Sequence, residues 1–548
     1  MIRLLTSLLF LAAVVPALAQ PFTRADSLRG ALRPERTCYD VYFYDLEVKV
    51  DPEKQRISGR TDIHFTAMQN FTEIQVDLFA NMFVDAITFE GKALDYRREF
   101  DAIFIEFPEE IRAPQQGMVR VAYSGNPQVA ARPPWDGGFV WKKDSNGKPW
   151  VGVACEGTGA SLWWPGKDYL GDEPDSMRIS VIHPIGLKAV CNGNQRSVTD
   201  LDVNWTKTEW FVSYPINNYN VTLNIGDYLH WSDTYTNASG THPLDYYVMP
   251  ENEAKSREQF AQVKPMLEVF EKHFGEYPFW RDGYALVETA YLGMEHQGAI
   301  AYGNKYLPGY AGYDALDLGW DYIIIHESGH EWWGNSVSCK DHAELWIHEG
   351  FCTYSEAVYV EALFDKATAV RYLRSQRRSI TNLSPIVGPL DVNFNNWSGS
   401  DMYYKGSWML HTLRHQVNDD ELWWKTLRNF AETFRLKNTD TQEVIAWWNE
   451  ALGADYTWLW RQYLYHAAPP RLLYKLKKKG SKKTKLRFKW EAGESDFRLP
   501  LTVQSTSGEP VKIYPTTDWK KAKITVPFDQ FKFDYSTWYG KTRNVGKK

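Results

Sequence analysis

Alternating apolar and polar positions characterise the first part of the chain, residues 38–233. Within residues 42–50 the even positions are apolar and most odd positions are polar, which is the pattern of a strand with one buried face. Similar runs recur at residues 57–65 and 177–182, and clusters of Gly, Asn and Pro separate them. The pattern predicts a large antiparallel β domain.

The period changes after residues 237–240, whose sequence Asn-Ala-Ser-Gly is typical of a linker. Beyond them a helical face is predicted for Phe260, Val263, Leu267, Phe270 and Phe274. Helical patterns continue to about residue 465, and the long segments are residues 321–335, 343–363 and 406–417. Helices are therefore expected to dominate the centre of the chain.

Alternation returns in the last 80 or so residues. A turn at Gly480-Ser481 predicts a hairpin that pairs one apolar strand face with another, namely Leu472, Tyr474 and Leu476 with Leu486, Phe488 and Trp490. Its outer lysines are interpreted as a solvated face that discourages edge pairing. The predicted organisation is a β domain over residues 20–236, a catalytic domain over 241–466 and a small β domain over 471–548.

Composition narrows the class of protein. The 548 residues are 44% hydrophobic and 24% charged, as in a globular protein of several domains. A formal charge of −6 gives no reason to expect a nucleic-acid or acidic-membrane partner. The five cysteines fit no cysteine-based zinc site, and both buried thiols and one or two disulfides remain open. The 24 tryptophans favour aromatic-rich packing over a binding cleft.

The N-terminus predicts export. A short positive start, an apolar run over residues 4–15 and the sequence Ala17-Leu18-Ala19 match a cleaved signal peptide over residues 1–19. No later stretch of about 18 apolar residues is present, so a soluble mature chain is expected in the periplasm or outside the cell.

The segment that carries chemistry is His326-Glu327-Ser328-Gly329-His330. Two histidines four residues apart lie on the same face of a helix, so both imidazoles can bind one zinc ion. Glu327 is then close enough to act as general base on a metal-activated water.

A catalytic zinc needs a third protein ligand, and the candidate is Glu349, eighteen residues after His330. A second helix packed antiparallel to the first would bring its carboxylate over the metal. His342 and His348 lack the spacing and are interpreted as surface residues or as neighbours of the ligands. Glu356 is a candidate partner for a ligand histidine, although a solvent-facing role is nearly as well supported.

Together these segments resemble the zinc aminopeptidases that include aminopeptidase N and leukotriene hydrolase. That family carries His-Glu-x-x-His followed after eighteen residues by Glu in a Trp-Leu-Asn-Glu-Gly-Phe segment. Here Trp346-Ile347-His348-Glu349-Gly350-Phe351 matches the second part, and Trp332-Trp333-Gly334-Asn335 matches the continuation of the first. The resemblance covers roughly residues 40–465. It implies an N-terminal β saddle domain, a thermolysin-like α+β catalytic domain and a small C-terminal β domain.

The same resemblance implies roles for further residues. Leu292-Gly293-Met294-Glu295-His296 is similar to the family's Gly-Ala-Met-Glu-Asn, which assigns the substrate's amino group to Glu295 and its backbone to Gly293 and Met294. Leu292 and His296 depart from that motif. Tyr403-Tyr404-Lys405-Gly406 matches Tyr-x-Lys-Gly and places the transition-state tyrosine at Tyr403. Cys155-Glu156-Gly157 resembles Gln-x-Glu-Ala and makes Glu156 a second amine anchor.

The predicted function is a zinc aminopeptidase with one Zn²⁺ per chain that cleaves peptides with a free N-terminus. Endopeptidase or epoxide hydrolase activity on the same scaffold is the nearest alternative. A non-catalytic, tryptophan-rich binding protein is the alternative from another class. The preferred first residue and the oligomeric state do not follow from the sequence.

Overall fold

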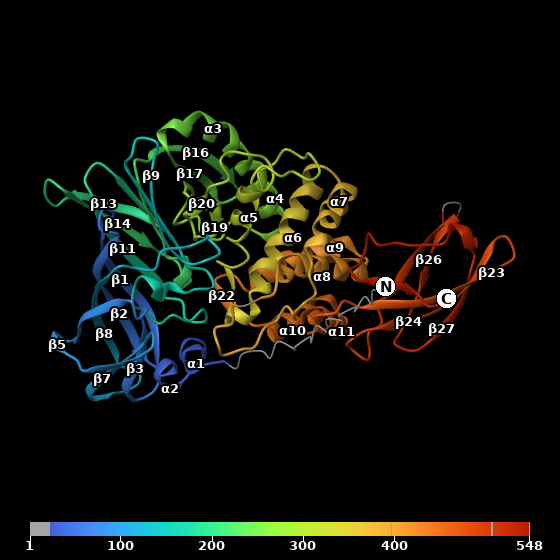
Figure 1. Ribbon diagram of the computed structural model, residues 1–548, viewed down its shortest axis with the longest axis horizontal. Helices are drawn as coiled ribbons and strands as arrows, with labels where there is room; N and C mark the ends of the chain where they lie inside the picture. The colour runs from blue at the N-terminus through green and yellow to red at the C-terminus, as the bar shows by residue number, and fades with distance from the viewer. Residues whose placement is uncertain (1–21, 396, 506–507, 547–548) are drawn as a thin grey trace, which may run out of the picture.

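The computed structural model describes residues 22–395, 397–505 and 508–546, so the predicted signal peptide lies outside the described residues. Three units follow one another along the long axis: a β-rich N-terminal unit, a largely helical centre and a C-terminal β unit (Figure 1). The predicted multidomain α+β fold is confirmed.

Two short helices, α1 (Arg24–Gly30) and α2 (Pro34–Thr37), precede the N-terminal sheets. The largest sheet has the order β13 (Asn194–Asp200), β14 (Trp205–Val212), β11 (Ser176–Pro184), β1 (Tyr39–Asp51), β2 (Arg56–Ala67), β8 (Gln116–Gly125), β4 (Met82–Phe89) and β5 (Lys92–Ala93). A second sheet comprises β12 (Lys188–Cys191), β15 (Leu223–Gly226), β10 (Pro149–Ala154) and β9 (Gly138–Lys143). A third comprises β3 (Phe71–Asp77), β7 (Ala102–Ile111) and β6 (Tyr96–Glu99).

The three strands that alternation predicts in this unit are confirmed as β1, β2 and β11. In β1 the even positions Leu46, Val48 and Val50 are buried and the odd ones between them are half-buried, as the pattern requires. One pairing departs from the expectation, because β1 and β11 run parallel. Parallel neighbours need a long crossover, and alternation within a strand carries no information about its partner.

The central unit is built on a five-stranded sheet covered by helices (Figure 1). Its strand order is β16 (Leu229–Asn237), β17 (Gly240–Val248), β18 (Tyr284–Glu288), β20 (Ile300–Tyr302) and β19 (Gly293–Met294). The helices are α3 (Glu253–Gln259), α4 (Val263–Phe274), α5 (Tyr322–Gly329), α6 (Trp346–Leu363), α7 (Lys366–Gln376), α8 (Asp401–Val417), α9 (Asp420–Thr433), α10 (Thr441–Leu452) and α11 (Thr457–Leu464). A small ladder joins β21 (Val337–Cys339) to β22 (Lys437–Thr439).

The prediction of a linker at residues 237–240 is wrong. Asn237 and Gly240 are paired, so the segment is the two-residue turn of a hairpin between β16 and β17. Short polar residues and glycine suit tight turns as well as linkers, and only the strand pairing distinguishes the two. The central sheet therefore extends across the predicted domain boundary.

Helix α5 is shorter than the predicted segment of residues 321–335. Asp321 caps its first turn by accepting from the backbone N–H groups of Ile323 and Ile324. The helix ends at Gly329 with His330 as its C-cap, and Gly334 then adopts a φ of 129°, which favours glycine. The predicted apolar face is confirmed, because Phe260, in the 3-10 turn before α4, and Val263, Leu267, Phe270 and Phe274 of α4 are all buried.

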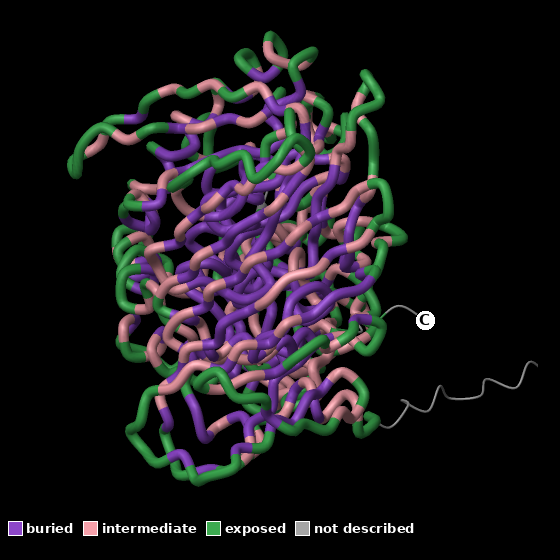
Figure 2. The backbone as a smooth tube through the Cα atoms, turned by 90° about the vertical axis from the view of Figure 1, so that its left-hand side faces the viewer, coloured by how far each residue is buried: buried purple, intermediate pink, exposed green. Residues whose placement is uncertain are grey.

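In the side view, buried backbone fills the interior of the molecule and exposed segments lie at the periphery (Figure 2). Most of the largest fully buried side chains are tryptophans. They include Trp163, Trp164, Trp332, Trp333, Trp346, Trp408, Trp423, Trp448 and Trp460. This agrees with a packing role for much of the aromatic surplus. All five cysteines are buried and free.

The C-terminal unit contains the predicted hairpin, with the register that the apolar positions require. Leu472 pairs with Trp490, Tyr474 with Phe488 and Leu476 with Leu486. One sheet comprises β27 (Lys520–Ile524), β24 (Lys483–Glu491), β23 (Arg471–Lys479) and β29 (Lys541–Asn544), and the other β26 (Gly508–Ile513), β25 (Leu501–Ser505) and β28 (Lys532–Phe533). Within the described residues, no helix is long and apolar enough to cross a membrane.

Candidate active site

Two histidines and one glutamate meet where α5 and α6 pack together. The Nε2 atoms of His326 and His330 lie 3.3 Å apart. The Oε2 atom of Glu349 lies 3.5 Å from the first and 3.4 Å from the second. Ligands bound at about 2.0–2.2 Å around a tetrahedral zinc ion are themselves roughly 3.3 Å apart. The triangle therefore has the size that a shared zinc ion requires.

The carboxylate of Glu349 supports the same conclusion. Its Oε2 atom is buried and has no hydrogen-bond partner among the described residues, an arrangement that is costly unless the atom binds something. Burial would raise the pKa of Glu349, but His330 and His326 hold it well below its usual range. An ionised carboxylate facing two imidazole nitrogens fits zinc as its ligand.

The far side of each imidazole is held by a hydrogen bond. His330 donates from Nδ1 to the carbonyl of Trp333 at 2.8 Å. His326 Nδ1 lies 2.7 Å from Glu356 Oε1, and the other oxygen of Glu356 accepts from Tyr372 and Gln376 at 2.5 and 2.9 Å. These bonds leave both Nε2 atoms free to bind a metal, as partners of ligand histidines do. Glu356 is fully buried, so the solvent-facing alternative is wrong.

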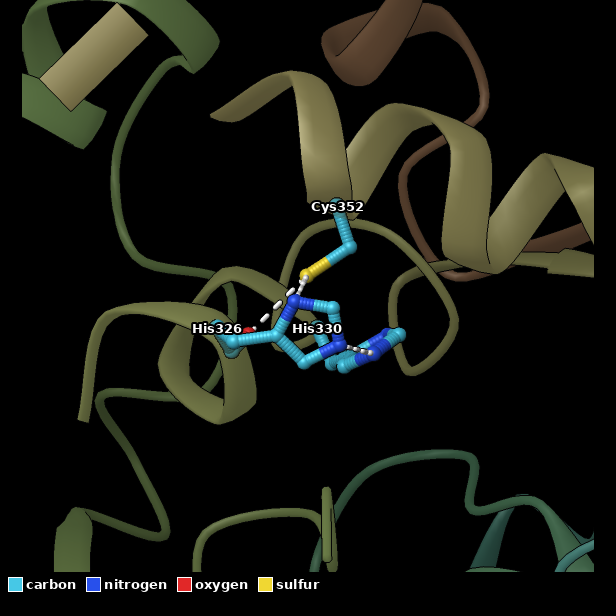
Figure 3. Close-up of side chains that lie close together, drawn as sticks. All are labelled: His326, His330 and Cys352. Atoms are coloured by element: carbon cyan, nitrogen blue, oxygen red, sulfur yellow. Dashed lines mark hydrogen bonds between the residues drawn. The ribbon is translucent and has the colours of Figure 1, made fainter. Parts of the chain in front are cut away.

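Cys352 is a third potential ligand close to the two histidines (Figure 3). Its thiol donates to the carbonyl of His326 at 2.9 Å, and the sulfur lies 3.8 Å from Nδ1 of that ring. Nδ1 is the nitrogen engaged by Glu356, on the opposite edge from the Nε2 triangle. The sulfur therefore lies behind the two rings, and Glu349 is the residue whose oxygen faces both Nε2 atoms.

Glu327 lines the same cavity as the three ligands. It abuts Gly293 of β19, where an added Cβ would come within 2.6 Å of Glu327 Oε1. A glycine is thus required to leave this carboxylate room. Burial raises the pKa of Glu327 to about 8, as expected for a carboxyl group held out of water.

Two further acids, Glu295 and Glu156, line this cavity although they come from different units of the chain. Glu295 follows β19, and Glu156 follows β10. Burial and then the charge of Glu295 raise the pKa of Glu156 well above its usual range. The two carboxyl groups thus face one cavity and could share a cation there. Gly293 and Met294, the other predicted substrate contacts, also line the cavity.

The structure identifies a supporting residue that the sequence did not. Tyr219 donates its hydroxyl to Glu295 Oε1 at 3.1 Å. Behind it, Nδ1 of His348 lies 3.4 Å from the Tyr219 oxygen, and Nε2 accepts from the backbone of Cys339 at 2.9 Å. His348 is fully buried and His342 nearly so, which excludes the surface alternative for both and leaves the alternative that they are neighbours of the ligands. His348 stands where the family motif has Asn, and that departure was the available signal.

The two departures in the amine-binding motif differ in their consequences. Leu292 lines the cavity and can contact a substrate. His296 is fully buried and is not among the lining residues, and neither ring nitrogen has a hydrogen-bond partner in the described chain. Burial lowers its pKa to about 3, so the ring is neutral. His296 is therefore set back from the cavity surface, unlike Leu292.

Tyr403 lies beside the metal ligands because α6 and α8 approach closely. Two glycines make this possible, since a Cβ on Gly406 would lie 3.0 Å from the Cα of Gly350. The Tyr403 ring stacks on His326 with centroids 6.2 Å apart, and its hydroxyl interacts with Glu349. Tyr404 also lines the cavity but lies between it and a neighbouring cavity. The hydroxyl of Tyr403 is the one that faces the metal triangle.

A zinc-type ligand triangle with an adjacent buried glutamate, at the junction of a β unit and a helical unit, defines the class of metallopeptidases. Residues 41–219 match the model of the peptidase M1 N-terminal domain, and residues 258–463 match that of the peptidase family M1 domain. The chain belongs to the M1 peptidase family.

The curated relatives share about a quarter of the aligned residues with this chain, and they are longer than it. Glutamyl aminopeptidase of Rattus norvegicus is 25% identical over 447 residues, covering 73% of this chain and 44% of the relative. Aminopeptidase N of Escherichia coli (strain K12) is 27% identical over 246 residues, covering 41% and 28%. The chain thus spans less than half the length of these relatives.

Among solved structures, the M1 zinc metallopeptidase of Deinococcus radiodurans has the same fold. The TM-score is 0.65 at 20% identity, and the match covers 78% of this chain and 94% of that one.

Proposed function

We propose that this protein is a zinc-dependent aminopeptidase that hydrolyses the first peptide bond of peptides with a free N-terminus. The observation that carries the proposal is the position of Glu295 and Glu156, which line one cavity together with the metal triangle and the buried Glu327. A cation site beside a hydrolytic metal site suits a substrate whose ammonium group adjoins the bond to be cut. The curated relatives named aminopeptidases support the same activity.

The ligands proposed for one Zn²⁺ per chain are His326, His330 and Glu349. When bound there, zinc would polarise a water molecule and the carbonyl of the scissile bond. Glu327 takes the proton from the attacking water and passes it to the leaving amine. Its raised pKa suits an acceptor that must also donate.

Tyr403 would supply a hydroxyl to the oxygen that becomes negatively charged when the carbonyl is attacked. A donor held in place before the reaction lowers the barrier because no reorganisation is needed. Its stacking on His326 and its contact with Glu349 support this position.

Glu295 and Glu156 fix the substrate by its ammonium group, so that only the first peptide bond reaches Glu327. The hydrogen bond from Tyr219 orients Glu295 and keeps one of its oxygens in place. Gly293 and Met294 offer the adjoining edge strand β19 to the substrate backbone.

The alternatives make different demands on this cavity. An endopeptidase has no need for two acids, one buried and one half-buried, at the end of the substrate site. An epoxide hydrolase would not need a peptide-length path. A non-catalytic binding protein would not retain the metal triangle, Glu327 and Tyr403 together.

The deciding experiment compares one peptide in free and N-acetylated forms by mass spectrometry. Acetylation removes the ammonium charge and adds bulk where the two acids converge. The free peptide should be shortened residue by residue, and the acetylated one should be nearly inert. Internal cleavage of both forms at similar rates would establish an endopeptidase instead. Zinc content near one per chain should accompany the activity.

We also propose export through the signal peptide at residues 1–19, with the mature protein in the periplasm or secreted. N-terminal sequencing of the mature protein should begin at Gln20. A mature chain that retains Met1 would contradict export.

A further inference from the structure

A second cavity, of about 690 Å³, adjoins the cavity of the metal triangle, which measures about 190 Å³. The two share Trp135, Leu292 and Tyr310 as walls. The two cavities are therefore adjacent at these three residues, and we refer to the larger one as the distal cavity. A substrate too long for the metal cavity has space there.

Strand β19 sets the direction from one cavity to the other. Glu295 follows the strand, Gly293 within it abuts Glu327, and Leu292 precedes it and lines both cavities. The amine anchor, the proton acceptor and the entrance to the distal cavity thus come in that order. If the proposed function holds, a peptide with its amino group at Glu295 and its first bond at Glu327 continues into the distal cavity.

The distal cavity is cationic. Lys142 and Lys143 at the end of β9, and Lys305 after β20, line it and are exposed. Among the described residues none of the three forms an ion pair. Lys148 of the same β9–β10 hairpin differs, because its ammonium pairs with Asp227 at 2.5 Å. Three lysines without acidic partners around one cavity are available to a bound anion.

One acid, Glu288, also lines the distal cavity, but it is 6% exposed and its oxygens are already engaged. They accept from the backbone of Met249 at 2.8 Å, from Asn252 at 2.7 Å and from Tyr306 at 2.8 Å. Glu288 therefore leaves the ammonium groups of the lysines unpaired.

The distance from the amine anchors sets the length of the ligand. Lys142 pairs with Trp150 in the register of β9 and β10, and Glu156 is six residues further along the chain. Because β10 ends at Ala154, the span of these six residues is at most the extended length of about 20 Å. An extended peptide of about six residues covers the same distance. A carboxylate four or five residues beyond the first bond would thus reach the lysines.

We propose that the distal cavity binds a carboxylate of the substrate through Lys142 and Lys305, with Lys143 at its edge. The enzyme therefore prefers peptides of about six residues that end in a free carboxylate, or longer peptides with Asp or Glu at that distance. Both carboxylates present the same chemistry to the lysines. Because the lysines are exposed, each ion pair contributes modestly, and about a three- to tenfold gain in kcat/KM is expected from the pair of lysines together.

The test uses a hexapeptide as free acid and as C-terminal amide, with kcat/KM measured for both. Wild-type protein should favour the acid about three- to tenfold, mainly through KM, and the preference should fall with added salt. Lys142→Gln/Lys305→Gln should cleave the two forms equally. Lys148→Gln, on the same hairpin, should retain the preference. A further pair, amidated peptides with Asp or Asn as fifth residue, distinguishes a side-chain carboxylate from the terminal one.

An aminoacyl anilide separates this proposal from the proposed function, because it is too short to reach the lysines. Hydrolysis of the anilide by wild-type protein without any acid preference among hexapeptides would overturn the carboxylate site alone. Failure to hydrolyse the anilide and the hexapeptides would overturn the aminopeptidase itself. Retention of the preference in the double variant, with an unchanged unfolding temperature, would also overturn the assignment of the lysines.

Discussion

The metal triangle and the amine anchors are built in different ways. His326, His330 and Glu349 lie within 24 residues of one another in sequence, on one helix with its C-cap and on the next helix. Glu156 and Glu295 come from a sheet of the N-terminal unit and from the central sheet. The part proposed to perform hydrolysis is therefore nearly local, whereas the part proposed to select a free N-terminus depends on how two units pack. Damage to the first should abolish turnover, and damage to the second should change which substrates are used.

The largest effect is expected from Glu327→Gln, which removes the proton acceptor and keeps the shape of the side chain. Turnover should fall by up to roughly 10⁴-fold, the upper range for a general base. Zinc content by atomic absorption should remain near one per chain. Glu349→Ala is the counterpart and should lose zinc. Normal turnover in Glu327→Gln would contradict the proposed mechanism.

Tyr403→Phe should come next. Loss of one donor to the developing oxyanion should lower kcat by roughly 10²–10³-fold with little change in KM. Steady-state kinetics on an aminoacyl anilide measures both constants. Tyr404→Phe is the matched control on the adjacent position and should be mild. The reverse ranking would mean that Tyr404 carries the role.

Glu356→Gln tests the support behind the metal triangle. The bond to His326 Nδ1 would lose its charge, and partners of this kind typically contribute 10- to 100-fold in metal affinity. Titration with a zinc chelator should therefore remove the metal from the variant at about 10- to 100-fold lower chelator concentration. An unchanged zinc affinity would show that Glu356 only fills space.

The smallest effect is expected from Tyr219→Phe, which acts on the amine anchors and leaves the triangle intact. Glu295 would lose a hydrogen bond at 3.1 Å, and bonds to charged groups contribute about 1.5–3 kcal/mol. Water can replace the lost hydrogen bond, and Glu156 can still bind the ammonium group. We therefore expect about a tenfold rise in KM for free-amine peptides, with kcat and zinc content unchanged. A fall in zinc content would indicate that the comparison between the two regions is wrong.

Several features followed from local patterns alone. The strand β1, the apolar face of α4 and the register of the β23–β24 hairpin were predictable because alternation and helical spacing record which face of a segment is buried. The family was recognisable because its motifs are short and occur in a given order. The roles assigned to the site residues remain predictions until the variants above are measured.

Other features had no local signal. The turn at Asn237–Gly240 was mistaken for a linker because the same residue types serve both. The parallel pairing of β1 with β11 joins segments that are far apart in the sequence. Tyr219 and the burial of His348 became visible only when three separate segments met behind Glu295.

By itself, the sequence determined the metal chemistry of this protein, because the helical repeat places residues i and i+4 side by side regardless of the remaining chain. Tertiary structure alone decided what surrounds that chemistry. The close contact of Gly350 with Gly406 brings Tyr403 near Glu349. The packing of the β unit on the central unit places Glu156 and Glu295 in one cavity. Contacts between distant segments depend on the shapes of whole units, which no short motif records.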